Sequence, residues 1–111
     1  MSVFLNRLLA LEEATRVADG AGGYTLNWVE LGKLWAAVEA GTGRERADQS
    51  VTLSEVAYTV SVRAVPVGSP RRPRPEQRFR DGARVFRIET VSERDLRGMY
   101  LDCAVIEEVV A

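Results

Sequence analysis

The stretch Val56-Ala57-Tyr58-Thr59-Val60-Ser61-Val62-Arg63 carries the clearest structural signal in the chain. Valine and tyrosine occupy its even-numbered positions, and small or polar side chains occupy most of the odd-numbered ones. Successive side chains of a strand point to opposite faces, and β-branched and aromatic residues favour strands. The pattern therefore predicts a half-buried β-strand, and we expect the fold to be built around it.

Similar but weaker patterns lie on both sides of this stretch. Toward the C-terminus, residues 85–91 and 99–105 alternate in the same way and predict two more strands. Toward the N-terminus, residues 33–40 and 24–28 predict two others, separated by a turn. The apolar run at residues 3–11 fits either a strand or a short helix, because periodicity does not separate the two over this length.

Glycines and polar runs divide these segments. Asp19-Gly20-Ala21-Gly22-Gly23 is a turn signal, so residues 3–11 and 24–28 are expected to form a hairpin around it. Residues 44–54 are polar and predict a loop, or a short helix if a partner supports it. The sequence thus predicts a single all-β domain over residues 1–111. It would be a small barrel or sandwich of five to seven short antiparallel strands with long loops and at most one short helix.

Composition excludes much of ordinary enzymology. The 111 residues include no histidine and one cysteine, so a Ser-His-Asp triad, a Cys-His pair and a histidine-containing zinc site are excluded. Fifteen basic against 16 acidic residues give a net charge of -1, unlike a strongly basic nucleic-acid binder. Residues 1–11 lack the features of a signal peptide and no segment is long and apolar enough to span a membrane, so we expect neither. We expect no catalytic residues, no metal site, no cofactor and no enzymatic activity.

Four features with a conceivable chemical role have a more ordinary explanation. The glycine cluster at residues 19–23 lacks the lysine and following helix of a phosphate-binding loop. The pairs Glu12–Glu13 and Glu107–Glu108 are adjacent on strands, so each pair should point to opposite faces and remain solvated. Cys103 lies on the apolar face of its strand and is expected to be buried. Trp28 and Trp35 could stack bases, but core packing or a subunit contact is expected for them.

The segment of residues 66–80 stands apart from the rest. It holds four prolines and five arginines, so we expect it to be extended and exposed. It is either an arm that contacts DNA phosphates or an acidic partner, or a solvated loop. Acidic residues concentrate near both ends of the chain instead. A molecule with separate basic and acidic regions can dock head-to-tail on its own copies, which generates rings or filaments.

An ordered set of short motifs resembles the phage head–tail joining proteins, the small connector subunits of long-tailed phages. The set combines a Gly-Gly turn, a tryptophan about five residues later, a Trp-Ala-Ala-Val strand and a Gly-Arg-Glu motif. It extends over nearly the whole chain, and the segment at residues 66–76 is longer and richer in proline than in that family. The matching residues are Leu5-Asn6-Arg7, Asp19, Gly22-Gly23, Trp28, Trp35-Ala36-Ala37-Val38, Gly43-Arg44-Glu45, Tyr58 to Arg63, Arg78-Phe79, Asp81-Gly82, Phe86-Arg87-Ile88 and Leu101.

The resemblance implies a definite structural role. Such proteins are small β-barrels that form a ring at the portal vertex, with six- or twelve-fold symmetry, and continue the DNA channel between capsid and tail. The implied partners are a portal-side adaptor, a tail terminator or tail-tube protein, and packaged double-stranded DNA, with no membrane. The implied location is the head–tail neck of a virion or gene transfer agent particle assembled in the bacterial cytoplasm.

Some members of the family act as a stopper, in which a loop projects into the lumen and holds the packaged DNA. Residues 41–54 would correspond to that loop here, with Gly43, Arg44, Glu45, Arg46, Asp48 and Gln49 as its contact candidates. Residues 66–80 would supply inter-subunit contacts through Arg71, Arg72, Arg74, Arg78 and Arg80. The alternative function is an OB-like module that binds single-stranded nucleic acid through the tryptophans and the arginine-rich segment.

Overall fold

The described part of the computed structural model, residues 3–41 and 53–110, contains six antiparallel strands and no helix. The all-β prediction is therefore confirmed. The strands are β1 (Arg7–Ala18), β2 (Tyr24–Ala40), β3 (Leu53–Arg63), β4 (Arg78–Asp81), β5 (Arg84–Glu93) and β6 (Tyr100–Val110).

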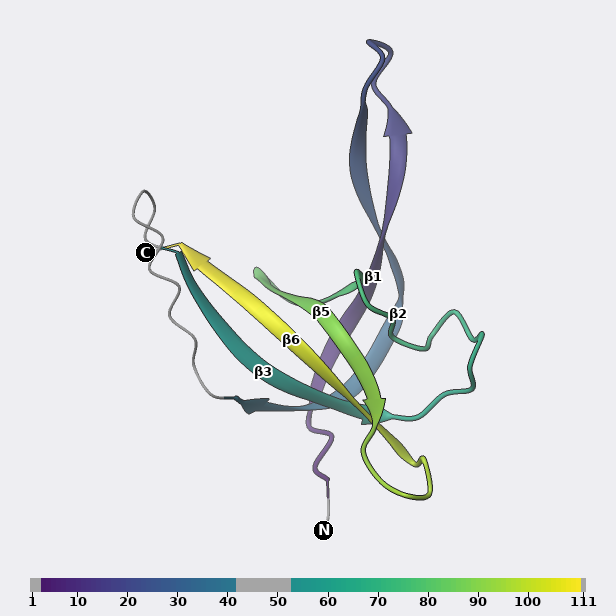
Figure 1. The fold of residues 1–111 in the computed structure, drawn as a ribbon, viewed down its shortest axis with the longest axis vertical. Coiled ribbons are helices and arrows are strands. Elements are labelled where there is room, and N and C mark those ends of the chain that lie inside the picture. The colour runs from purple at the N-terminus through teal and green to yellow at the C-terminus, as the bar shows by residue number, and fades with distance from the viewer. Residues whose placement is uncertain (1–2, 42–52, 111) are drawn as a thin grey trace.

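The strands form one sheet in the order β1-β2-β3-β6-β5-β4, which closes into a barrel where β4 returns to β1. This closing seam is short, because only three residue pairs join Ala10–Glu12 to Arg78–Arg80. Elsewhere the ladders are long, and β3 pairs with β6 along its whole length. Figure 1 shows the strongly bent strands β3, β5 and β6 on one side of the barrel, with β1 and β2 crossing the other.

The stretch that predicted a strand lies in the middle of this sheet. β3 pairs with β2 through residues 58–62 and with β6 on its other edge. The side chains of Val60 and Val62 are fully buried, while the Ser61 hydroxyl donates a 2.6 Å hydrogen bond to Asp102 of β6. The alternation in the sequence therefore marks the two faces of β3, as expected.

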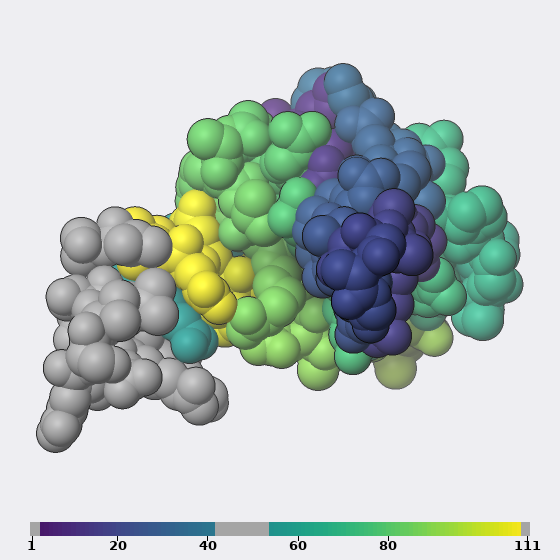
Figure 2. All heavy atoms as spheres, turned by 90° about the horizontal axis from the view of Figure 1, so that it is seen from above, coloured from purple at the N-terminus to yellow at the C-terminus, as the bar shows by residue number. Residues whose placement is uncertain are grey.

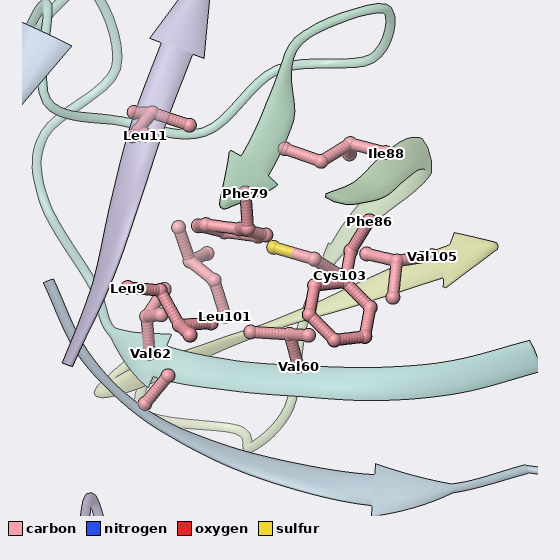
Figure 3. Packing of buried hydrophobic residues seen from close by; sticks show 11 residues of the cluster. Leu9, Leu11, Val60, Val62, Phe79, Phe86, Ile88, Leu101, Cys103 and Val105 are labelled. Atoms are coloured by element: carbon pink, nitrogen blue, oxygen red, sulfur yellow. The ribbon is translucent and has the colours of Figure 1, made fainter. Parts of the chain in front are cut away.

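Every strand contributes to one hydrophobic core. Figure 3 shows the labelled side chains pointing toward one another between the strands. Phe79 and Phe86 are its largest buried members, and the Tyr58 ring packs edge-on against Phe86 with ring centroids 5.5 Å apart. The core consists of Leu9, Leu11, Ala36, Val60, Val62, Phe79, Phe86, Ile88, Leu101, Cys103 and Val105.

The predicted N-terminal hairpin is present around the glycine turn, but its pairing differs from the prediction, because residues 24–28 pair with residues 14–18 and residues 7–11 pair with residues 32–36. β1 and β2 pair without interruption from Arg7–Ala36 to Ala18–Tyr24, apart from one bulge. At the tip, the Asp19 carboxylate accepts hydrogen bonds from the backbone N–H groups of Ala21 and Gly23. Residues 13–18 and 24–31 lie beyond the barrel, and we call them the ribbon. Figure 1 shows the ribbon standing away from the barrel body.

The turn predicted between residues 24–28 and 33–40 does not exist, because both segments belong to the single strand β2. Pairing with β1 continues through this region. Leu11 lies opposite Gly32 and Glu12 lies opposite Glu30, so Leu31 is accommodated as a bulge. Gly32 follows this bulge with a φ of 158°, which residues other than glycine rarely adopt, and the Arg71 side chain lies over it.

The loop predicted for residues 66–80 ends earlier than expected. Residues 64–77 form no strand, but Arg78–Asp81 forms β4. The short strand forms because it pairs with β1 on one side and with β5 on the other, and because Phe79 at its centre is buried in the core. The loop is also not wholly exposed, since Pro73 and Gln77 are buried against the body.

Candidate interaction surfaces

The five arginines predicted to make inter-subunit contacts all have partners within their own chain. Arg71 donates to the Lys33 carbonyl at 2.9 Å, and Arg72 donates to the Val65 carbonyl at 2.9 Å. Arg74 forms an ion pair with Glu13 at 2.6 Å. Folding therefore brings the basic centre of the sequence onto its acidic N-terminal segment, and the two regions partly neutralise each other.

Glu12 holds the remaining two arginines of this group. Its side chain accepts from Arg78 at 2.7 Å and from Arg80 at 2.8 Å, and the residue is only 4% exposed. The prediction that Glu12 is a solvated surface carboxylate was wrong, because β4 pairs beside it and covers it. Glu13, its neighbour, is partly exposed and binds Arg74. The alternation of arginines around Phe79 was the sequence signal for this arrangement.

Glu107 is a second carboxylate that was predicted to be solvated, and this prediction was also wrong. It is buried on the core side of β6 and receives two hydrogen bonds from Arg84, at 2.8 and 3.0 Å. These hydrogen bonds lower the pKa of Glu107, although burial opposes them, and they raise the pKa of Arg84 in turn. The Arg84 guanidinium also lies 4.9 Å from the centre of the Phe86 ring.

A shallow groove of about 370 Å³ lies at the base of the ribbon. The Arg78 guanidinium lies 4.0 Å above the centre of the Trp28 ring there, so one face of this tryptophan is already covered. The groove carries acidic and basic side chains in equal number, which does not favour a nucleic-acid phosphate backbone. Its lining residues are Trp28, Glu76, Arg78, Val85, Arg87, Ile106 and Glu108.

Trp35 belongs to a different surface. It is 56% exposed and pairs across strands with Leu8, which is also exposed, on the outer face of the barrel. Core packing is therefore excluded for Trp35, and of the two expectations a subunit contact stays a prediction. Seven residues of extended β2 separate it from Trp28, so the two rings do not form one stacking platform.

Cys103 is buried in the core, as predicted, and burial raises the pKa of its thiol to about 12. Such a thiol stays protonated at neutral pH and acts as a small apolar group. Residues 3–41 and 53–110 contain no cluster of acidic and cysteine side chains able to hold a metal ion. The same residues include no helix long and apolar enough to cross a membrane.

The predicted contact residues Gly43, Arg44, Glu45, Arg46, Asp48 and Gln49 lie outside the described residues. Of the segment 41–54 assigned to the lumen-facing loop, the structure describes the two ends. The Gly41 N–H donates to the Ala57 carbonyl at 2.7 Å, and residues 53–54 already belong to β3.

Known proteins that are similar to this chain identify its family. The family model for phage head completion proteins matches residues 3–109. The chain belongs to the phage head completion protein family. A chain in the structure of the virion of a native gene transfer agent particle is similar to this head completion protein. It is 64% identical, with a TM-score of 0.85 and 96% of each chain covered. No curated protein matches the chain.

Family membership fixes the general role of this head completion protein. It is a structural head–tail component of a phage-type particle, where it assembles with other head and tail proteins. Its location is therefore the virion particle. The resemblance drawn from the sequence motifs is confirmed at this level.

Proposed function

We propose that this protein forms a ring in the neck of a gene transfer agent or phage particle, between a portal-side adaptor and the tail. The ring would continue the DNA channel and act as the stopper that retains packaged DNA. The observation that carries the proposal is the 64% identity, over nearly the full length of both chains, to a chain in a gene transfer agent virion.

The chemistry of the described residues supports an assembly role. The buried carboxylates Glu12 and Glu107 form ion pairs with arginines of the same chain. These charged groups therefore stabilise the barrel and are not free to bind a ligand. Exposed apolar side chains are present on the ribbon, at Tyr24, Leu26 and neighbouring positions, and as the cross-strand pair of Leu8 and Trp35. Contacts between subunits of a particle use surfaces of this kind, because apolar area removed from water drives association.

The segment at residues 41–54 supplies the test of the stopper role. Arg44 and Arg46 are the residues proposed to contact DNA or neighbouring loops in the lumen. Their joint replacement by alanine should leave capsids assembled but lower the fraction that retains DNA or carries a tail. Arg97→Ala, an exposed arginine in the turn between β5 and β6, is the matched control. DNA retention and tail joining equal to the control would contradict the stopper role.

The alternative, a module that binds single-stranded nucleic acid, makes a different prediction. The isolated protein would bind oligonucleotides tightly, with an affinity that falls steeply as salt rises. A ring subunit in which Arg74, Arg78 and Arg80 are paired with its own carboxylates should bind weakly as a monomer. A salt-titrated binding measurement with the purified chain therefore separates the two functions.

A further inference from the structure

The ribbon contributes no buried side chain to the hydrophobic core, so packing within the barrel does not explain why it exists. Its strands pair with each other and, within the described residues, with nothing else. β1 meets β4 only up to Glu12, and β2 meets β3 only from Ala36. Residues 13–18 and 24–31 therefore each present one open edge. Figure 2, which looks down on the ribbon, shows it standing in front of the body.

Open edges of this length are unusual in soluble proteins, because unpaired N–H and C=O groups invite pairing with another chain. Natural proteins protect such edges with proline, lysine or bulges. The stretch Tyr24-Thr25-Leu26-Asn27-Trp28-Val29-Glu30-Leu31 has neither proline nor lysine, and its bulge lies at the ribbon base. Tyr24 and Leu26 are 55% and 56% exposed, and Val17 and Val29 are also exposed.

The two open edges of one ribbon fit each other in a ring. β1 and β2 run antiparallel, and rotation about a ring axis to which the ribbon is tilted preserves this alternation of directions. The β2 edge of one copy then faces the β1 edge of the next copy in antiparallel orientation. Repeated around the axis, this contact makes a closed up-and-down crown of strands without any open edge.

Charge on the ribbon fits the same contact. Arg16 of β1 and Glu30 of β2 lie on the same face of the ribbon. Within the described residues the Arg16 guanidinium lies 4.4 Å from the centre of the Tyr24 ring, and neither Arg16 nor Glu30 forms an ion pair. Arg16 lies opposite Leu26 in its own chain, and Glu30 is four residues further along β2. Strands in a closed barrel are staggered, and such a stagger brings Arg16 of one copy toward Glu30 of the next.

We propose that the ribbons of neighbouring copies pair edge to edge, β2 of one with β1 of the next, and that Arg16 and Glu30 face each other across this contact. The inference rests on the proposed ring and specifies how its subunits are joined. The ring would then contain two structural layers, the barrels and a crown formed from the ribbons.

Cross-linking of assembled particles tests the contact directly. In an Arg16→Cys/Glu30→Cys double variant, the two cysteines of one copy lie about 13 Å apart along the strands, from four residues at 3.3 Å each. A bismaleimide reagent shorter than that distance can join them only between copies. The native Cys103 is buried and should not react. The expected product is a ladder of covalent multimers of this protein, while each single variant gives none.

The outcomes separate this inference from the proposed function. Electron microscopy of the same particles reports whether the protein forms a ring. A ring with no multimers, or with cross-links only to a different particle protein, overturns the ribbon contact and leaves the proposed function intact. Particles that contain the protein without any ring would overturn both proposals.

Charge exchange provides a second test that needs no cross-linker. Arg16→Glu and Glu30→Arg should each lower the yield of tailed particles at least about tenfold, since a small loss repeats at every contact around the ring. The double variant restores opposite charges and should recover most of that yield. Unchanged denaturant midpoints of the purified variants show that folding is intact. A double variant no better than the single ones would overturn the pairing.

Discussion

The barrel and the ribbon share the strands β1 and β2, yet they differ in strand pairing and in the burial of their apolar side chains. In the barrel, strands have partners on both sides along their buried stretches, and the core side chains are fully removed from water. In the ribbon, the same two strands have one partner each, and large apolar side chains remain exposed. The barrel is explained by its own stability, whereas the exposed surface of the ribbon would be explained by the contacts between copies proposed above.

The largest effect on stability should come from the barrel core. Phe79→Ala removes a fully buried ring from the short strand β4 and should lower the free energy of unfolding by about 3–5 kcal/mol. Tyr24→Ala in the ribbon removes an aromatic ring that is already half exposed, and should cost less than about 1 kcal/mol. Urea unfolding of the purified variants measures both. Equal losses would mean that the two regions do not differ as described.

A smaller effect should come from the closing seam. Glu12→Gln removes the charge that holds Arg78 and Arg80, and we expect a loss of about 2 kcal/mol. Glu30 lies directly opposite Glu12 on β2 but is exposed and forms no ion pair within the described residues. Glu30→Gln is therefore the matched control for folding and should leave the unfolding midpoint unchanged. A comparable loss in both variants would contradict a specific role for the seam.

These carboxylates also show where sequence reasoning reached its limit. β3 and the hairpin could be predicted, because alternation and a glycine turn are local signals. Burial of Glu12 and Glu107 could not, since Glu12 meets Arg78 and Arg80 from 66 and 68 residues away in the chain. β4 was missed because the alternation of arginines around Phe79 is too short to stand out from the proline-rich loop before it. β2 was divided because a turn was predicted between residues 28 and 33.

The pair of Glu107 and Arg84 predicts how the barrel responds to acid. The folded-state pKa of Glu107 is lowered, so its stabilisation is present in full above the unfolded pKa of about 4.3 and is lost as pH falls through the folded value. Glu107→Gln should therefore lose less stability between pH 7 and pH 3 than the wild type does. Glu108→Gln, at an exposed neighbouring position, should behave like the wild type. Identical pH profiles for all three proteins would contradict the assignment.

The smallest effect on stability should accompany a large effect on assembly. Leu26→Ser changes an exposed side chain in the middle of the ribbon and should alter the free energy of unfolding by less than about 0.5 kcal/mol. If the ribbon exists for contacts between copies, the same variant should reduce incorporation of the protein into particles, measured by immunoblotting of purified particles. Val67→Ser, at an exposed position in the loop before β4, is the matched control. Normal incorporation of both variants would contradict a role of the ribbon in assembly, because its apolar surface would then contribute neither to folding nor to contacts between copies.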